Sequence, residues 1–210
     1  MKAVIFDRDG VIIDSETLHI DSVIKAFDTF NIKITEEEKK LIIGRHPEDY
    51  KKFFINKNNF QYDKFREIQR KEFRELFKSA SLFKETITLI KKLYELKIPL
   101  ALTTSAGIKS TLEVVENANI KNMFNFIITS EDYNQRKPHP EPYLITAKKL
   151  KLNPKDCIVI EDSYVGVESA KNAGMKCIAI SNKLTNQDLS KADLIVNSAK
   201  EINIDLLNQL

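Results

Sequence analysis

The sequence lacks any apolar stretch that could cross a membrane. None of the hydrophobic runs in its 210 residues approaches the roughly 18 consecutive apolar residues that a membrane-spanning helix needs. It also shows no signal-peptide pattern. These absences argue against membrane and secretory classes, so we expect a cytoplasmic protein with no membrane partner.

Cysteine, excess charge and repetition are scarce as well. Both cysteines, Cys157 and Cys177, lie in apolar, strand-like segments, so we expect reduced core thiols rather than a disulfide or a metal pair. The formal net charge is only +3, and the basic residues between 64 and 78 alternate with glutamates. This pattern favours a solvated helix face over a nucleic-acid site. There is no internal repeat or low-complexity tract.

The chain does contain enough apolar sequence for one core and a smaller accessory unit, with 42% hydrophobic and 30% charged residues. Residues 1–14 and about 80–210 alternate strand-length apolar runs with helix-like segments, as a parallel α/β sheet does. Residues 15–79 contain no convincing strand and carry apolar residues at helical spacing. We therefore predict an α/β core with an inserted helical unit.

Two carboxylates follow the first apolar run. In the opening segment MKAVIFDRDGVIID, Asp7 and Asp9 come directly after a predicted buried strand, and Gly10 allows the chain to turn away. Ligands of open α/β sheets bind where parallel strands end. Two acidic groups at this place suggest a metal site, a covalent intermediate or both.

Three further apolar runs also end in polar side chains. The hydroxyls of Thr103, Thr104 and Ser105 end the run 98–103, Lys137 follows the run 126–129 in a proline-rich loop, and Glu161 and Asp162 follow the run 157–160. Singly, these side chains are as well explained as turn formers or helix caps. Their occurrence in order, each after a predicted strand, favours one common site.

The four motifs FDRDGV, TTSA, RKPHPEPY and EDSYVGVESAKNAGM resemble those of the haloacid dehalogenase-like hydrolases, in the branch that includes β-phosphoglucomutase and small sugar-phosphate phosphatases. The resemblance covers most of the chain. It implies a Rossmann-like parallel sheet core formed by residues 1–14 and 80–210, with an inserted α-helical cap domain at 15–79. Such a cap would act as a lid that closes over the substrate.

For this family, the residue types predict phosphoryl transfer with Mg²⁺ as cofactor. A carboxylate can attack a phosphate monoester only if a cation neutralises the negative charge. We expect Mg²⁺ to bind the Asp7 carboxylate, the Asp9 backbone carbonyl and the Asp162 carboxylate, with Glu161 holding a coordinated water. Lys137 would balance the acidic cluster and bind phosphate.

The proton-transfer and phosphate-binding roles follow from the same resemblance. Asp7 is the expected nucleophile, and Asp9 the acid that protonates the leaving group and then the base that activates water. Thr104 would hydrogen-bond the transferred phosphate, with Ser105 and Thr103 as alternatives in register. The family's dehalogenases lack the second aspartate, so Asp9 favours phosphoryl transfer.

A few residues distinguish this chain from its relatives or bear on its choice of substrate. Arg8 stands where close relatives carry an apolar residue, and it would reach either the substrate or a cap carboxylate. In the cap, His19 matches a mutase-like pattern and would hydrogen-bond Asp9 on closure. Pro47 falls where the mutase has a substrate-binding arginine, so Arg45 could replace that arginine only by a different geometry.

We therefore predict a phosphatase that acts on a small phosphorylated metabolite, such as a sugar phosphate, as a monomer and without nucleic acid. The alternative is a β-phosphoglucomutase-type mutase. A phospho-accepting signalling receiver uses similar groups, but it would not need the inserted cap or Asp9. A catalytically dead scaffold is disfavoured because every expected catalytic group is present.

Overall fold

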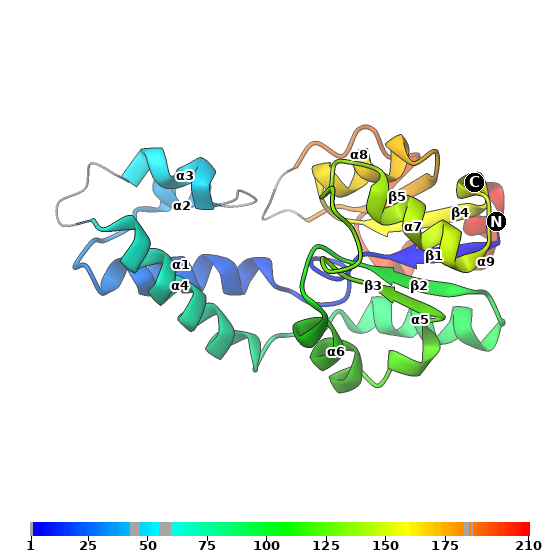
Figure 1. The fold of residues 1–210 in the computed structure, drawn as a ribbon, viewed down its shortest axis with the longest axis horizontal. Helices are drawn as coiled ribbons and strands as arrows, with labels where there is room; N and C mark the ends of the chain where they lie inside the picture. The colour runs from blue at the N-terminus through cyan, green and yellow to red at the C-terminus, as the bar shows by residue number, and fades with distance from the viewer. Residues whose placement is uncertain (1, 43–46, 55–59, 183–184, 186) are drawn as a thin grey trace. The chain divides into compact units, whose positions relative to one another are not determined.

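The computed structural model describes residues 2–42, 47–54, 60–182, 185 and 187–210, drawn as a coloured ribbon in Figure 1. The chain divides into two compact units, one formed by Met1–Ile13, Leu82–Lys183 and Gln187–Leu210 and the other by Asp14–Ser81 with Leu184–Asn186. Within the described ranges, no helix is both long and apolar enough to span a lipid bilayer.

The first unit, which we call the core unit, is built on a parallel sheet of six strands in the order β3-β2-β1-β4-β5-β6. The strands are β1 (Ala3–Phe6), β2 (Leu100–Thr103), β3 (Phe126–Ile128), β4 (Cys157–Glu161), β5 (Lys176–Ile180) and β6 (Leu194–Val196). The predicted α/β fold with a parallel sheet is therefore confirmed. The strand order reverses between β1 and β4, and open sheets bind ligands beyond the strand ends at such a point.

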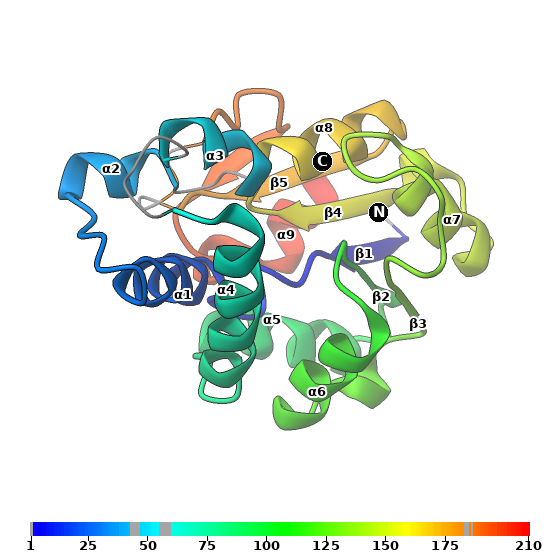
Figure 2. The same cartoon turned by 60° about the vertical axis from the view of Figure 1, so that its left-hand side comes forward.

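Helices cover both faces of this sheet. Figures 1 and 2 show α7 (Glu141–Leu150) and α8 (Tyr164–Asn172) on one face, and α5 (Lys84–Glu95) and α6 (Ile108–Asn117) on the other. A short α9 (Ile204–Gln209) follows β6. Two-sided cover explains why every residue of β1, β2 and β4 is buried.

The alternation of side chains along the strands decides which face the site occupies. In β1, Ala3 and Ile5 belong to the core cluster beneath α7 and α8, whereas the ring of Phe6 meets Phe124 edge-on, with 6.3 Å between centroids. In β4, Cys157 and Val159 share the cluster of Ile5. The residues two positions beyond Ile5 and Val159 therefore project to the same face. Cys157 and Cys177 are buried free thiols, as predicted.

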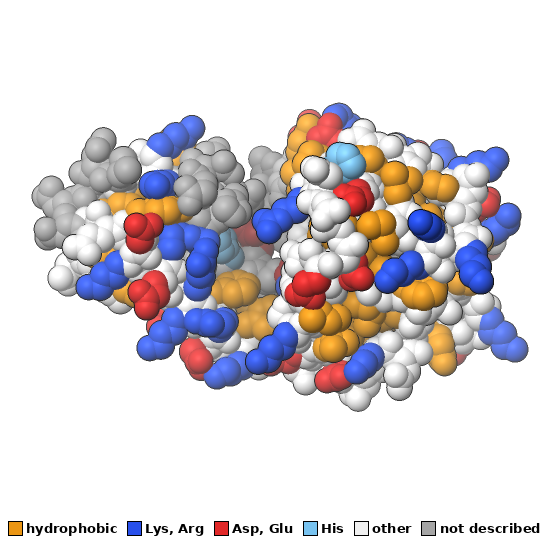
Figure 3. Space-filling view, viewed as in Figure 1, with side chains coloured by type: hydrophobic (Ala, Val, Ile, Leu, Met, Phe, Trp, Pro, Cys, Tyr) orange, Lys and Arg blue, Asp and Glu red, His pale blue; other side chains and the backbone are white. Residues whose placement is uncertain are grey.

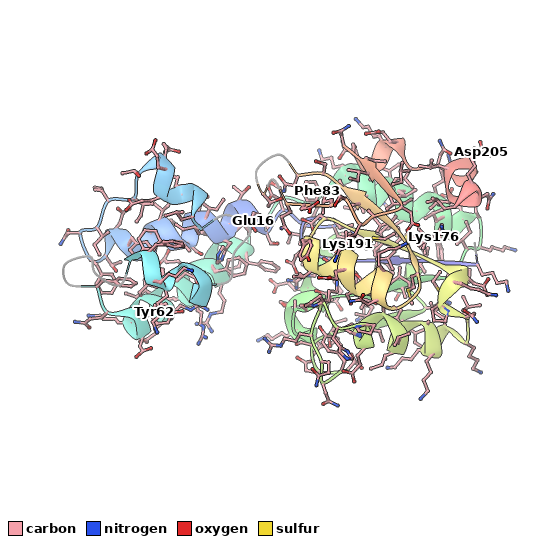
Figure 4. All side chains as sticks on the ribbon, turned by 90° about the horizontal axis from the view of Figure 1, so that it is seen from above. Glu16, Tyr62, Phe83, Lys176, Lys191 and Asp205 are labelled. Carbon is pink, nitrogen blue, oxygen red and sulfur yellow. The ribbon has the colours of Figure 1, made fainter. Side chains whose placement is uncertain are left out.

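The second unit, which we call the helical unit, has a core of its own. Its helices are α1 (Glu16–Asp28), α2 (Glu36–Lys40), α3 (Pro47–Phe54) and α4 (Tyr62–Phe77), and Figure 4 labels Glu16 and Tyr62 at the starts of α1 and α4. The ring of Phe27 lies 4.8 Å from Phe54 and 4.5 Å from Phe65, centroid to centroid. Gln69 donates a 2.8 Å hydrogen bond to the Ser22 hydroxyl, which joins α4 to α1. The role of this unit as a cap stays a prediction.

The two chain segments at the junction of the units pair with each other. The amide of Asp14 donates to the carbonyl of Ser81, and the amide of Phe83, labelled in Figure 4, donates to the carbonyl of Ile12, both at 2.9 Å. Between them, Ile13 forms an antiparallel bridge with Leu82. The insertion therefore leaves and re-enters the core unit at adjacent backbone positions.

Candidate active site

The site begins with a buried lysine that joins two strand ends. Asp7 follows β1 and Glu161 ends β4, and both project to the face covered by α7 and α8. Lys137 reaches them from the loop after β3. Its Nζ lies 2.6 Å from Asp7 Oδ1 and 2.7 Å from Glu161 Oε1, with all three side chains at most 10% exposed. It also donates a 3.3 Å hydrogen bond to the carbonyl of Thr103.

A third carboxylate completes an acidic cluster. Ligand oxygens of Asp7, Glu161 and Asp162 all lie within 4.8 Å of one another. Three buried carboxylates against the single ammonium of Lys137 leave two negative charges uncompensated when all are ionised. A charge excess of this kind in a buried site calls for a cation.

The pKa values of the cluster follow from burial and mutual repulsion. Burial raises the pKa of Asp7 to about 7, because it outweighs the attraction of Lys137. Burial and the charges of Glu161 and Asp7 hold the pKa of Asp162 well above its usual range. Burial opposes ionisation of Glu161, but Lys137 and the Ser163 hydrogen bonds lower its pKa below the ordinary value. Burial would likewise lower the pKa of Lys137, yet Asp7 and Glu161 raise it well above its ordinary value.

The donor set fits a hard divalent cation such as Mg²⁺. All three groups offer oxygen atoms, which Mg²⁺ prefers, and its two charges equal the excess of the cluster. The oxygens of Glu161 already accept several hydrogen bonds. Oε1 accepts from Lys137 and Tyr143, and Oε2 accepts from the Asp162 amide and from Ser163. Asp7 and Asp162 are therefore the carboxylates best placed to bind a cation directly, with Glu161 behind them.

Asp9 lies outside this cluster and is paired with Arg8. The Arg8 Nε donates to Asp9 Oδ2 at 3.0 Å, and Nη2 donates to Asp9 Oδ1 at 2.9 Å. The Arg8 Nη1 donates to the hydroxyls of Ser110 and Thr111 at 3.0 and 3.4 Å. Arg8, whose target the sequence left open, therefore ties Asp9 to the first turn of α6.

The hydroxyl loop after β2 presents its side chains unequally. The Thr104 hydroxyl is buried and accepts a 3.1 Å hydrogen bond from the Ala106 amide. The Thr103 hydroxyl pairs with Thr146 of α7 at 2.7 Å. Ser105 is exposed. The predicted phosphate contacts of Thr104 and Ser105 stay predictions.

Tyr143 belongs to the site although the sequence reasoning assigned it no role. Its hydroxyl donates a 2.9 Å hydrogen bond to Glu161, and its ring centroid lies 4.7 Å from Lys137 Nζ. The side chain is fully buried. It closes the RKPHPEPY motif, and its position six residues after Lys137, in the first turn of α7, is the sequence feature by which it could have been found.

Two glycines make room for the carboxylates. A Cβ on Gly10, whose φ is +71°, would lie 1.8 Å from Asp162 Oδ2. A Cβ on Gly166 in α8 would lie 1.7 Å from Glu161 Oε1. Real Cβ atoms essentially never approach another atom so closely, so these two positions exclude any other residue while the carboxylates stay in place.

We expect Gly166→Ala to displace the Glu161 carboxylate and to separate it from Lys137. Turnover should fall by at least about tenfold, since a displacement of about 1 Å in a site can cost on the order of 10². Gly174→Ala is the matched control. A Cβ there meets no atom within 4 Å, but φ is +75°, so this variant should lose stability and keep its kcat. Steady-state kinetics and thermal melts of both proteins would test this; equal kcat for both variants would contradict it.

The predicted cap residues lie in the helical unit. His19 is on α1, and its ring lies 6.5 Å from that of Phe73, centroid to centroid, in an edge-on arrangement. Its predicted hydrogen bond to Asp9 stays a prediction. Arg45 lies outside the described residues.

The surface of the core unit carries charges of both signs. Figure 3 shows basic and acidic side chains interspersed over the face of the core unit in view. Oppositely charged side chains of the core unit form pairs, for example Lys171 with Asp193 at 2.5 Å and Lys149 with Asp132 at 3.4 Å. Nucleic-acid sites instead gather charges of one sign.

Comparison with known proteins agrees with this geometry. The chain is 30% identical over 184 residues to a phosphorylated carbohydrates phosphatase of Thermotoga maritima, covering 85% of this chain and 84% of that protein. Its fold matches that of a β-phosphoglucomutase of Clostridium difficile, with a TM-score of 0.78, 25% identity and coverage of 100% and 96%. The fold also matches that of a HAD family hydrolase of Deinococcus radiodurans with bound phosphate and sodium. The TM-score is 0.84 and the identity 20%, and the match covers 99% of this chain and 96% of that one. The sequence pattern of the haloacid dehalogenase-like hydrolases matches residues 4–180. With its four motifs lying where the strands of the sheet end, the chain belongs to the haloacid dehalogenase-like hydrolases.

Proposed function

We propose that this hydrolase is a Mg²⁺-dependent phosphatase that cleaves a small phosphate monoester, such as a sugar phosphate, through an aspartyl-phosphate on Asp7. One observation carries the proposal. Asp7 is held by Lys137 beside Glu161 and Asp162, in a buried cluster that needs a divalent cation and lies where the strand order reverses. The phosphorylated carbohydrates phosphatase among its relatives supports the substrate class.

In the proposed reaction the protein supplies the nucleophile, its orientation and the proton transfers. Lys137 holds Oδ1 of Asp7, which fixes the direction of the carboxylate. A bound Mg²⁺ would neutralise negative charge on the phosphoryl group and on the acidic cluster. Asp7 attacks phosphorus while Asp9 gives its proton to the leaving oxygen, and the alcohol departs. Asp9 then takes a proton from water as that water attacks the phosphorus of the aspartyl-phosphate, which frees Asp7 and releases phosphate.

We also propose that the helical unit acts as the cap of the family and chooses the substrate. Small changes on such a lid alter binding without touching the chemical groups. His19 and Arg45 are its candidate contacts. The structural match to the β-phosphoglucomutase spans this whole chain and 96% of that enzyme, so a phosphosugar mutase is the second candidate.

Phosphate release from a panel of phosphorylated metabolites, with Mg²⁺ and with EDTA, would test the proposal. We expect Mg²⁺-dependent release from one class of compounds. Conversion of β-glucose 1-phosphate to the 6-phosphate in the presence of the bisphosphate, without phosphate release, would favour the mutase. A stable aspartyl-phosphate that never turns over would favour a signalling receiver and contradict the phosphatase.

A further inference from the structure

Arg8 is an unusual residue of the site. It stands between the two catalytic aspartates in the sequence, and its charged side chain is buried. The residue is only 4% exposed. Among the described residues, its charged group donates hydrogen bonds to Asp9 and to Ser110 and Thr111 of α6. A buried guanidinium costs free energy unless it is fully paired, so its partners indicate what it does.

The contact with Asp9 is bidentate. Two different nitrogens of Arg8 bind the two oxygens of Asp9 at 3.0 and 2.9 Å. A planar guanidinium matches both carboxylate oxygens at once and fixes the carboxylate in direction as well as in position, which a lysine ammonium cannot do. The Asp9 side chain is 38% exposed and stands just before the Gly10 turn, so its immediate surroundings constrain it little.

The guanidinium of Arg8 is itself held in place by hydroxyl groups of α6. The remaining nitrogen of Arg8 donates to Ser110 and Thr111, and both hydroxyls also donate to the carbonyl of Gly107, at 3.1 and 2.9 Å. Through Arg8, the orientation of Asp9 is therefore tied to the first turn of α6, a helix of the core unit. This is how a supporting shell of hydrogen bonds holds a functional group.

We infer that Arg8 is a positioning residue that aims Asp9 for proton transfer, with Ser110 and Thr111 as its anchor. The inference rests on the proposed function. Two nitrogens of Arg8 hold the two oxygens of Asp9, so Arg8 fixes where those oxygens lie relative to α6. With a substrate whose leaving group needs little protonation, the step that depends on this positioning is attack of water on the aspartyl-phosphate, in which Asp9 takes the proton.

Pre-steady-state turnover of p-nitrophenyl phosphate with Mg²⁺ separates the two chemical steps. Its leaving group needs little protonation, so the first step reports on Asp7 and the second on Asp9. In Arg8→Met we expect the first turnover to stay within about threefold of wild type and the second step to slow by about 10²-fold, the scale of general base catalysis. A burst approaching one equivalent of nitrophenolate and an accumulating phosphoenzyme should follow. Arg8→Lys should show a smaller change in the same direction.

Two comparisons separate positioning from a general loss of structure. Adding Arg8→Met to Asp9→Asn should cause no further loss of rate, because the inferred effect of Arg8 on the second step passes through Asp9. Lys149→Met, which breaks the exposed pair with Asp132, should leave both steps unchanged. If Arg8→Met does not fold, the double variant Ser110→Ala/Thr111→Val keeps Arg8 and should slow the second step alone.

Several results would overturn the inference. These are equal slowing of both steps in Arg8→Met, wild-type rates in that protein, a further loss in the Asp9→Asn background, or an unchanged second step in the anchor variant. Absence of both phosphate release and phosphoenzyme in the wild-type protein would instead overturn the proposed function, and the inference with it.

Discussion

Replacing Asp7 by asparagine is expected to abolish turnover and, at the same time, to stabilise the metal-free protein above pH 7. The amide cannot form an acyl phosphate, so kcat should fall by at least about 10³-fold. The gain in stability has a different origin. The Asp7 carboxylate is buried, and burial raises its pKa from 3.8 to about 7 even beside Lys137, so its ionised form is costly in the folded state.

The sign of the pH dependence follows from this raised pKa. The folded protein holds a proton on Asp7 more tightly than the unfolded chain does, so the resulting stability is complete below pH 4 and is lost as the pH rises through about 7. Asparagine removes this dependence. Urea unfolding in EDTA should give nearly equal free energies for the two proteins at pH 4 and a variant more stable by a few kcal/mol at pH 8. A variant whose kcat falls by much less than about 10³-fold, or one no more stable at pH 8, would contradict the prediction.

Lys137→Met is expected to have the opposite effect on stability. It leaves Asp7 and Glu161 buried without the ammonium that lies 2.6 and 2.7 Å from them. Breaking a buried ion pair from one side typically costs about 3–5 kcal/mol, because the remaining charge has no partner. Turnover should also be lost, since Asp7 loses the group that orients it.

The matched control for Lys137→Met is Lys149→Met. Lys149 and Asp132 form a pair at 3.4 Å in which the side chains are 44% and 30% exposed, and such pairs contribute at most about 1 kcal/mol. Urea unfolding of both variants in EDTA at pH 8 measures the difference. Equal losses in the free energy of unfolding would show that Lys137 contributes no more to stability than the exposed Lys149, and would contradict the prediction.

The sheet and the central cluster were predictable because they depend on local patterns. Apolar runs of strand length, each followed by a polar residue, identify where strands end, and parallel strands end at one edge. Asp7 and Glu161 also share a face because each stands two positions beyond a residue of the same core cluster. This argument needs only the two-residue period with which side chains alternate along any strand.

The partners of Arg8 and Tyr143 were not predictable in the same way. Arg8, just after β1, contacts Thr111 of α6, which lies 103 residues further along the chain. Tyr143 of α7 contacts Glu161 at the end of β4, 18 residues further along. Such contacts depend on how α6 and α7 pack on the sheet, and no short-range period encodes that packing. The same holds for Gly166, whose need for hydrogen instead of a methyl group arises from the position of the Glu161 carboxylate.

The paired strands of chain at the junction of the two units have an evolutionary consequence. Because Ile13 and Leu82 lie opposite each other in a bridge, the whole segment between them leaves and rejoins the core unit at neighbouring backbone positions. A segment of another length could replace it by recombination while β1 and the Lys137 cluster kept their places. If the helical unit selects the substrate, as we propose, substrate preference can diversify by exchange of this entire segment while the chemical groups of the core unit stay unchanged.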